Sequence, residues 1–189
     1  MSAAPLLLDA LVALTRVFSA AGVRWYVFGA QAVVLYGQPR LTADLDVTVE
    51  GTPESVLRLL PALRQHGFEP RLEDAEGLLR RARVLLLIHR ASGLPVDLVV
   101  AGPGLEDEFL AQRRLVELGG VAVPVISPED LIVTKILAGR PKDLDDARGV
   151  LREQDGRLDI ERSRRFLRLL EQALDRSDLV GVLDQLLER

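Results

Sequence analysis

The sequence contains no cysteine and only two histidines, His66 and His89, which excludes several kinds of site. Without cysteine there is neither a disulfide bond nor a metal held by thiolates. Two histidines also argue against a zinc site rich in imidazole ligands. A metal bound by this chain would therefore be a hard cation, of the kind that carboxylate oxygens bind.

Lysine is nearly as scarce. Of the 24 basic residues, only Lys135 and Lys142 are lysines. This bias is typical of a GC-rich genome, and it makes the two remaining lysines candidates for a specific role. The formal net charge of −4 argues against the binding of bulk DNA, which requires a basic surface.

Long apolar runs are missing as well. No stretch approaches the roughly 20 apolar residues that a membrane helix needs. Asp9 and Arg16 interrupt the apolar N-terminal stretch, which therefore does not resemble a signal peptide. We expect a soluble, cytoplasmic protein that does not contact the membrane.

The hydropathy pattern predicts a mixed α/β (α+β) core over residues 1–126, in which helices flank a mixed sheet, and a helical part packed on it over 127–189. The hydrophobic content of 48% is enough for a packed core. The predicted strands are 25–28, 44–49, 82–89, 96–100 and a hairpin over 115–126. The predicted helices are 5–21, 29–36, 52–67, 128–138, 142–153, 160–174 and 177–187.

Three aspartates fall in two of the predicted strands. Asp44 and Asp46 are two residues apart, so their side chains point to one face, and Asp97 lies in a second strand. Carboxylates brought together in this way repel one another, and a divalent cation would neutralise them. The alternative is that they are solvent-facing ends of an amphipathic sheet. Gly29 favours the metal site, because it opens a helix whose N-terminus would bind a phosphate.

These residues resemble a known superfamily. The stretch Phe-Gly-Ala-Gln-Ala at 28–32, followed by Arg40, Thr42 and Asp44-Leu-Asp46, resembles the signature of the nucleotidyltransferase superfamily of DNA polymerase β type. The motif at 127–146, Ser-Pro-Glu-Asp-Leu-Ile-Val-Thr-Lys-Ile-Leu-Ala-Gly-Arg-Pro-Lys-Asp-Leu-Asp-Asp, is similar to AbiEii/MenT-like toxin nucleotidyltransferases and their uncharacterised stand-alone relatives.

The resemblance implies a role for each matching residue. Asp44, Asp46 and Asp97 would ligate two Mg²⁺ ions, with Mn²⁺ as an alternative, and Asp97 would also orient or deprotonate the attacking hydroxyl. Gly29 would let the triphosphate of an NTP such as ATP approach the backbone. Ala30 stands where many members have a serine that donates a hydrogen bond to a phosphate.

Further residues match the family pattern, and some of them also have another interpretation. Arg40 and Thr42 would contact the nucleotide. The alternative for Arg40 is a loop charge, and we favour the contact because Arg40 lies four residues before Asp44. Lys135 would contact the NTP, or else lie at the edge of the core with its ammonium in solvent. Asp146, and with less support Asp143, would form the acidic pair of the last motif.

The resemblance implies transfer of a nucleoside monophosphate from an NTP to a hydroxyl. The acceptor would be an RNA end such as that of tRNA, in a setting where a cognate antitoxin protein is the partner. A small molecule such as an aminoglycoside is the rival acceptor. A non-catalytic nucleotide-binding module of the same fold is the third hypothesis, and Ala30 supports it.

Overall fold

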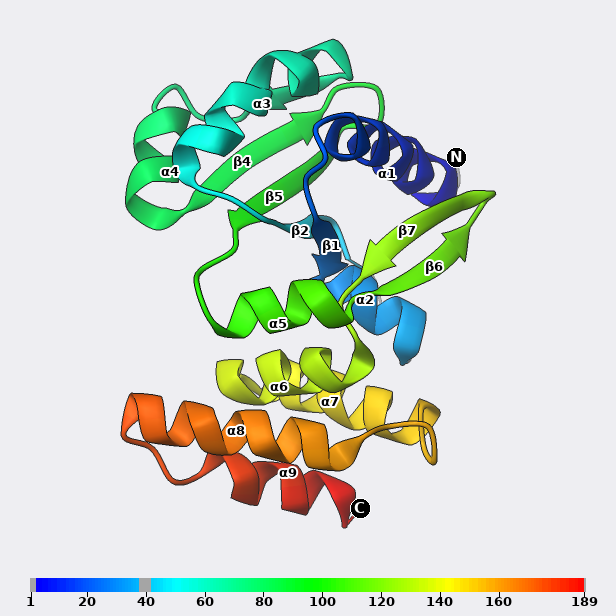
Figure 1. Cartoon of the computed structure of the whole chain (residues 1–189). Helices are drawn as coiled ribbons and strands as arrows, with labels where there is room; N and C mark the ends of the chain where they lie inside the picture. Colours follow the sequence, from blue (N-terminus) through cyan, green and yellow to red (C-terminus); the bar gives the residue numbers. More distant parts are fainter. Residues whose placement is uncertain (1–2, 38–41, 189) are drawn as a thin grey trace. The chain divides into compact units, whose positions relative to one another are not determined.

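The computed structural model describes residues 3–37 and 42–188 (Figure 1). Contacts divide the chain into two units. The first comprises residues 1–31 and 41–126, and the second comprises 32–40 and 127–189. Among the described residues, no helix combines the length and the apolar character that a membrane span requires.

The first unit is built on one mixed sheet. Within the described residues it has seven strands in the order β3-β4-β5-β2-β1-β7-β6. The pairs β1/β7 and β2/β5 are parallel, and the other neighbours are antiparallel. The strands are β1 (Trp25–Phe28), β2 (Leu45–Val49), β3 (Phe68–Pro70), β4 (Val84–His89), β5 (Leu94–Val100), β6 (Arg114–Leu118) and β7 (Val121–Val125).

Alternation along the strands separates a buried face from a more open one. Leu85 and Leu87 of β4 are fully buried and align with Leu98 and Val96 of β5. The residues between them, such as Leu86, are only half-buried and point to the other face. One face of this part of the sheet therefore forms the core, and the other is accessible.

Four helices and the first turn of α2 (Gly29–Tyr36) accompany this sheet in the described part of the first unit. The four helices are α1 (Ala3–Ala20), α3 (Pro53–Gln65), α4 (Ala75–Ala82) and α5 (Leu105–Gln112). Helix α1 contacts β5, β7 and α3, while α4 contacts β4. Helix α3 begins where sequence signals place it, because Thr52 and Ser55 cap each other's backbone N–H groups and Pro53 follows. The last residues of α2 group with the second unit.

The second unit is helical. Its remaining elements are α6 (Pro128–Ala138), α7 (Pro141–Glu153), α8 (Ile160–Leu174) and α9 (Leu179–Leu187). Helix α6 begins at a cap in which the Ser127 hydroxyl accepts from the Asp130 N–H at 3.1 Å. It ends at Gly139, whose φ of 66° is the left-handed conformation that glycine tolerates best. Helix α6 contacts α7, α8 and α9, and most of its residues are buried.

The fold class predicted from the sequence is confirmed: a mixed sheet with helices is followed by helices alone. The strand at 25–28, the helix at 29–36 and the hairpin around Gly119 and Gly120 lie where the pattern placed them. Three short elements, β3, α4 and α5, were not predicted.

Candidate active site

Asp46 and Asp97 lie side by side at the centre of the sheet. Strands β2 and β5 are parallel neighbours, and their register aligns Asp46 with Asp97. Aligned residues on adjacent strands point to the same face. The neighbours of Asp46 in the chain, Leu45 and Val47, are fully buried on the other face. Burial of these apolar residues fixes the direction of both carboxylates, as period-two alternation predicted.

Gly29 lies directly against the Asp46 carboxylate. A Cβ atom added at Gly29 would lie 1.9 Å from Oδ2 of Asp46, which is far inside van der Waals contact. The φ angle of Gly29 is 63°, so a side chain there would also strain the backbone. Since Gly29 is the first residue of α2, the carboxylate lies beside the positive end of a helix. A glycine is thus required at this position by both space and conformation.

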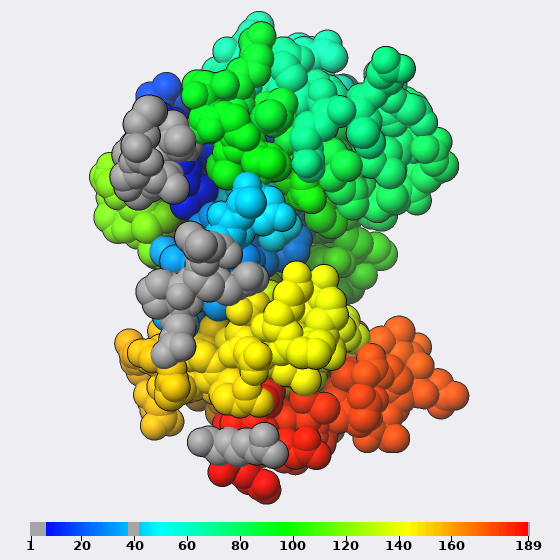
Figure 2. Space-filling view, turned by 180° about the vertical axis from the view of Figure 1, so that it is seen from behind, coloured from blue at the N-terminus to red at the C-terminus, as the bar shows by residue number. Residues whose placement is uncertain are grey.

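Asp44 comes just before β2 and is exposed. The hydroxyl of Thr42 donates to Oδ1 of Asp44 at 2.9 Å. In the view of Figure 2, the light-blue stretch that leads into β2 lies at the surface. In this structure Thr42 therefore orients Asp44, the first of the two aspartates in the Asp44-Leu-Asp46 stretch. Its predicted contact with the nucleotide stays a prediction.

Arg71 is a residue of this site that sequence reasoning missed. Its guanidinium Nη2 donates to Oδ1 of Asp97, and both side chains are 32% exposed. The residue follows β3, and its backbone N–H donates to the carbonyl of Leu86 at 2.9 Å. Strand β3 has three residues and contains a proline, so no periodic pattern in the sequence indicates a strand there. The contact depends on the pairing of β3 with β4, which the sequence does not reveal.

The donors present suit a divalent cation in their chemistry. Carboxylate oxygens are the ligands that Mg²⁺ prefers, and Asp46 and Asp97 share one face, with Asp44 two residues before Asp46. Within residues 3–37 and 42–188, no three His, Cys, Asp or Glu side chains are placed so that they could hold a metal. Asp97 is instead paired with Arg71. Metal binding by the three aspartates therefore stays a prediction.

Lys135 is buried in an ionic network of the second unit. Its ammonium donates to Asp143 at 3.1 Å and to Asp146 at 2.8 Å, and the three side chains are 9%, 1% and 7% exposed. Arg140 donates to the other oxygen of Asp143. Burial alone would raise the pKa of the Asp143 carboxyl, but hydrogen bonds from Arg140 and Lys135 outweigh it and lower that pKa.

The interpretation of Lys135 as a core-edge lysine with its ammonium in solvent is wrong. The ammonium is enclosed by two carboxylates, which the motif match had grouped with it as the acidic pair. A buried charge must be paired, and this pairing supplies a structural reason for all three residues. Whether Lys135 also contacts an NTP stays a prediction.

Arg40 and Ala30 are the two other residues predicted to lie at the nucleotide. Arg40 lies outside the described residues. Ala30, the second residue of α2, is 7% exposed. A serine there would place its hydroxyl in a largely enclosed position next to Gly29.

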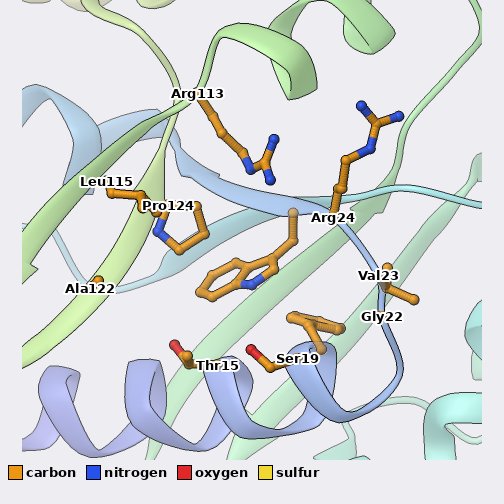
Figure 3. A pocket seen from close by; sticks show the side chains of 11 residues that line it. Thr15, Ser19, Gly22, Val23, Arg24, Arg113, Leu115, Ala122 and Pro124 are labelled. Atoms are coloured by element: carbon orange, nitrogen blue, oxygen red, sulfur yellow. The ribbon is translucent and has the colours of Figure 1, made fainter.

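A separate cavity of about 270 Å³ lies at the opposite end of β1. It lies between Arg24 and Arg113 on one side and Thr15 and Ser19 on the other (Figure 3). Arg24 is already paired with Glu50 at 2.6 Å. The cavity is lined by the first residue of β1, whereas Gly29 follows the last. It is therefore not part of the carboxylate site.

The match to a known protein family covers most of the chain. Residues 10–162 match the family described as "Nucleotidyltransferase of unknown function (DUF6036)". The chain belongs to this nucleotidyltransferase family. The resemblance to the nucleotidyltransferase superfamily is thereby confirmed. No protein of curated function matches the sequence.

Solved structures share the fold of this nucleotidyltransferase family at low identity. The antibiotic-resistance factor ANT(2'')-Ia is 16% identical with a TM-score of 0.58, over 91% of this chain and 94% of that chain. An antigenic nucleotidyltransferase-like protein from Paracoccidioides brasiliensis is 16% identical with a TM-score of 0.54, over 97% and 93%. The lincosamide antibiotic adenylyltransferase LnuA is 14% identical with a TM-score of 0.50, over 75% and 96%. At these identities the likeness establishes the fold alone.

Proposed function

We propose that this protein is a magnesium-dependent enzyme that transfers a nucleoside monophosphate from an NTP to a hydroxyl group. The observation that carries the proposal is the register of β2 and β5, which aligns Asp46 with Asp97 on one face beside Gly29. The chain belongs to a nucleotidyltransferase family, and two carboxylates on one face would suit a divalent cation in their chemistry, which supports the proposal.

The chemistry is an in-line displacement at phosphorus. The acceptor oxygen forms a bond to the α-phosphorus, the bond to the bridging oxygen of the β-phosphate breaks, and pyrophosphate leaves with the electron pair. The proton of the acceptor hydroxyl passes to a carboxylate oxygen of Asp97. Mg²⁺ held by Asp44, Asp46 and Asp97 would neutralise the phosphate charge and align the reacting oxygens. The backbone around Gly29 would position the phosphates at the start of α2.

Two classes of acceptor remain in competition. The motif at 127–146 resembles toxin-like nucleotidyltransferases, and it favours an RNA end such as that of tRNA, with an antitoxin protein as partner. The likeness in fold to ANT(2'')-Ia and LnuA, whose names refer to antibiotics, favours a hydroxylated small molecule. We give the motif more weight, because the likeness in fold extends over proteins of low identity.

The test is incubation of the protein with each labelled NTP and Mg²⁺, in the presence of total tRNA or a panel of aminoglycosides and lincosamides. Labelled acceptor should appear with the wild type and not with Asp46→Asn, which keeps the shape of the side chain but loses its charge. Binding of NTP and Mg²⁺ without label on RNA, protein or small molecule would favour the non-catalytic hypothesis.

Metal binding can be measured without any acceptor. A ligand that binds only the folded state at 100 times its Kd raises the free energy of unfolding by about 2.7 kcal/mol. Millimolar Mg²⁺ or Mn²⁺ should therefore raise the melting temperature of the wild type and have little effect on Asp46→Asn. A wild type that melts at the same temperature with and without either metal would contradict the proposed metal site.

A further inference from the structure

We propose that Arg71 is the resident counter-cation of Asp97, and that it exchanges this carboxylate for a phosphate of the nucleotide when a divalent cation binds. The inference rests on the proposed function, which supplies the metal and the nucleotide. It assigns a role to a residue outside the motifs that the sequence displays.

The register places Arg71 in one transverse row with the aspartates. Leu86 aligns with Asp97, and Asp97 aligns with Asp46. The pairing of β3 with β4 aligns Pro70 with Leu87, so Arg71, the next residue, lies beside Leu86. The backbone hydrogen bond from Arg71 to Leu86 agrees with this register. The guanidinium reaches Asp97 across the half-buried Leu86, on the face that carries both carboxylates.

This position makes Arg71 a competitor of the metal. A guanidinium on Oδ1 of Asp97 brings a positive charge into the space where a dication would be held by the same carboxylate. Two cations at such short range repel each other, and the side chains are too enclosed for water to screen the repulsion fully. Arg71 thus stabilises the aspartates in the metal-free protein and weakens their affinity for metal.

Exchange follows from the charge balance. Once Asp97 binds the metal, the guanidinium of Arg71 loses its carboxylate partner. The Arg71 side chain is long and about one-third exposed, so it can reach another anion beside the site. A planar guanidinium binds phosphate oxygens well, often through two parallel hydrogen bonds. The triphosphate that arrives with the metal supplies such oxygens. Arg71 would therefore move between Asp97 and the nucleotide, and would couple nucleotide binding to metal binding.

A second arginine at this edge of the sheet, Arg90, provides a control for Arg71. Arg64 and Arg90 both pair with Glu69, at 3.4 and 3.6 Å. Arg90 follows β4 and its side chain is 64% exposed. Arg90→Met removes the same charge from the same edge of the sheet without touching the Arg71–Asp97 pair.

The experiment measures binding of Mn²⁺, by its electron paramagnetic resonance signal, to wild type, Arg71→Met, Arg71→Lys and Arg90→Met. Loss of one charged hydrogen bond to Asp97 should tighten the binding of Mn²⁺ alone to Arg71→Met by about tenfold. Arg71→Lys, which keeps the charge, should stay near the wild type, and so should Arg90→Met. Inorganic tripolyphosphate, added with Mn²⁺, should bind Arg71→Met about tenfold more weakly than the wild type.

The outcomes separate this inference from the proposed function. If neither the wild type nor Arg71→Met binds Mn²⁺, the proposed metal site and the exchange both fail. If the wild type binds Mn²⁺ and Asp46→Asn does not, the metal site stands. In that case, unchanged or weaker Mn²⁺ binding by Arg71→Met, or unchanged tripolyphosphate binding, overturns the role of Arg71 alone.

Discussion

The carboxylate of Asp46 occupies the space that any side chain at position 29 would need. A Cβ atom at Gly29 would lie 1.9 Å from Asp46 Oδ2, and the φ of Gly29 is 63°. Gly29→Ala should therefore displace the aspartate and abolish nucleotidyl transfer. It should also lower the free energy of unfolding by more than the roughly 1–2 kcal/mol that a left-handed alanine costs. Urea denaturation and the transfer assay test both effects.

A second glycine provides the control for backbone strain. Gly22 has a φ of 66°, and a Cβ there would have no atom within 4 Å. Gly22→Ala should show the conformational cost alone and should keep full activity. Equal effects of the two substitutions would show that the contact with Asp46 is not what demands glycine at position 29.

Lys135 should be important for stability. Its removal leaves Asp143 and Asp146 buried without their shared cation, and breaking a buried ion pair costs about 3–5 kcal/mol. Lys135→Met should therefore unfold at much lower urea concentration than the wild type. This expectation replaces the small effect that a solvent-exposed lysine would have.

Two variants test the origin of this loss. Lys142→Met, at the exposed start of α7, should change the free energy of unfolding by no more than about 0.5 kcal/mol. Adding Asp143→Asn and Asp146→Asn to Lys135→Met should restore part of the loss, because the unpaired charges are then absent. If the folded Lys135→Met protein binds NTP as the wild type does, the lysine has only its structural role.

His89 should make stability depend on pH in the mildly acidic range. Burial lowers its pKa, against a smaller opposing effect of Asp9, and the ring lies 2.8 Å from the Ser92 hydroxyl and 4.8 Å from the Phe68 ring centroid. Since the folded pKa lies below the unfolded value of about 6.5, the unfolded state binds more protons between the two. The free energy of unfolding should fall as the pH decreases from about 7 through this range.

The measurement is urea denaturation of wild type and His89→Gln in steps from pH 7.5 to 5. Carboxylates titrate in both proteins, so the difference between the two curves isolates His89. The wild type should lose more stability than His89→Gln on acidification. Parallel curves, or a steeper loss in the variant, would contradict the assignment.

Catalysis should survive the alanine at position 30. One hydrogen bond to a charged phosphate contributes about 1.5–3 kcal/mol, or roughly one to two orders of magnitude in rate. Ala30→Ser should therefore be tolerated and raise turnover, provided that its enclosed position accommodates an oxygen. Steady-state kinetics with the acceptor that the labelling assay identifies would measure this. A protein that transfers nothing with either residue would support the non-catalytic alternative.

The sequence predicted the elements that have strong periodicity or clear caps. Strand β1, helix α2 and the β6–β7 hairpin follow from apolar runs bounded by glycine, and α6 follows from its Ser127 cap. Strand β3 was not predicted, because three residues are too few to show a period. Helices α4 and α5 were not predicted either, because their eight residues include several charged ones and lack the apolar run of the equally short α2. Strand β3 is instead defined by its pairing with β4, and α4 by its contacts with α3 and β4.

The same limit applies to the candidate site. The shared face of Asp46 and Asp97 could be predicted, since alternation fixes the direction of each side chain. The pairing of Arg71 with Asp97 could not, because it requires the order of strands in the sheet. The scarcity of lysine drew attention to Lys135, but only the three-dimensional packing shows that two aspartates enclose it.

The division of the chain into two units affects which fragments of the protein can fold and in what order the chain folds. Residues 32–37 belong with the helices from 127 onward, and the side chain of Gln154 donates to the Tyr36 carbonyl at 2.9 Å. A fragment that starts at residue 127 would therefore lack part of its own helical unit. During synthesis, the end of α2 leaves the ribosome long before its partners exist, so completion of that unit depends on contacts between distant parts of the chain.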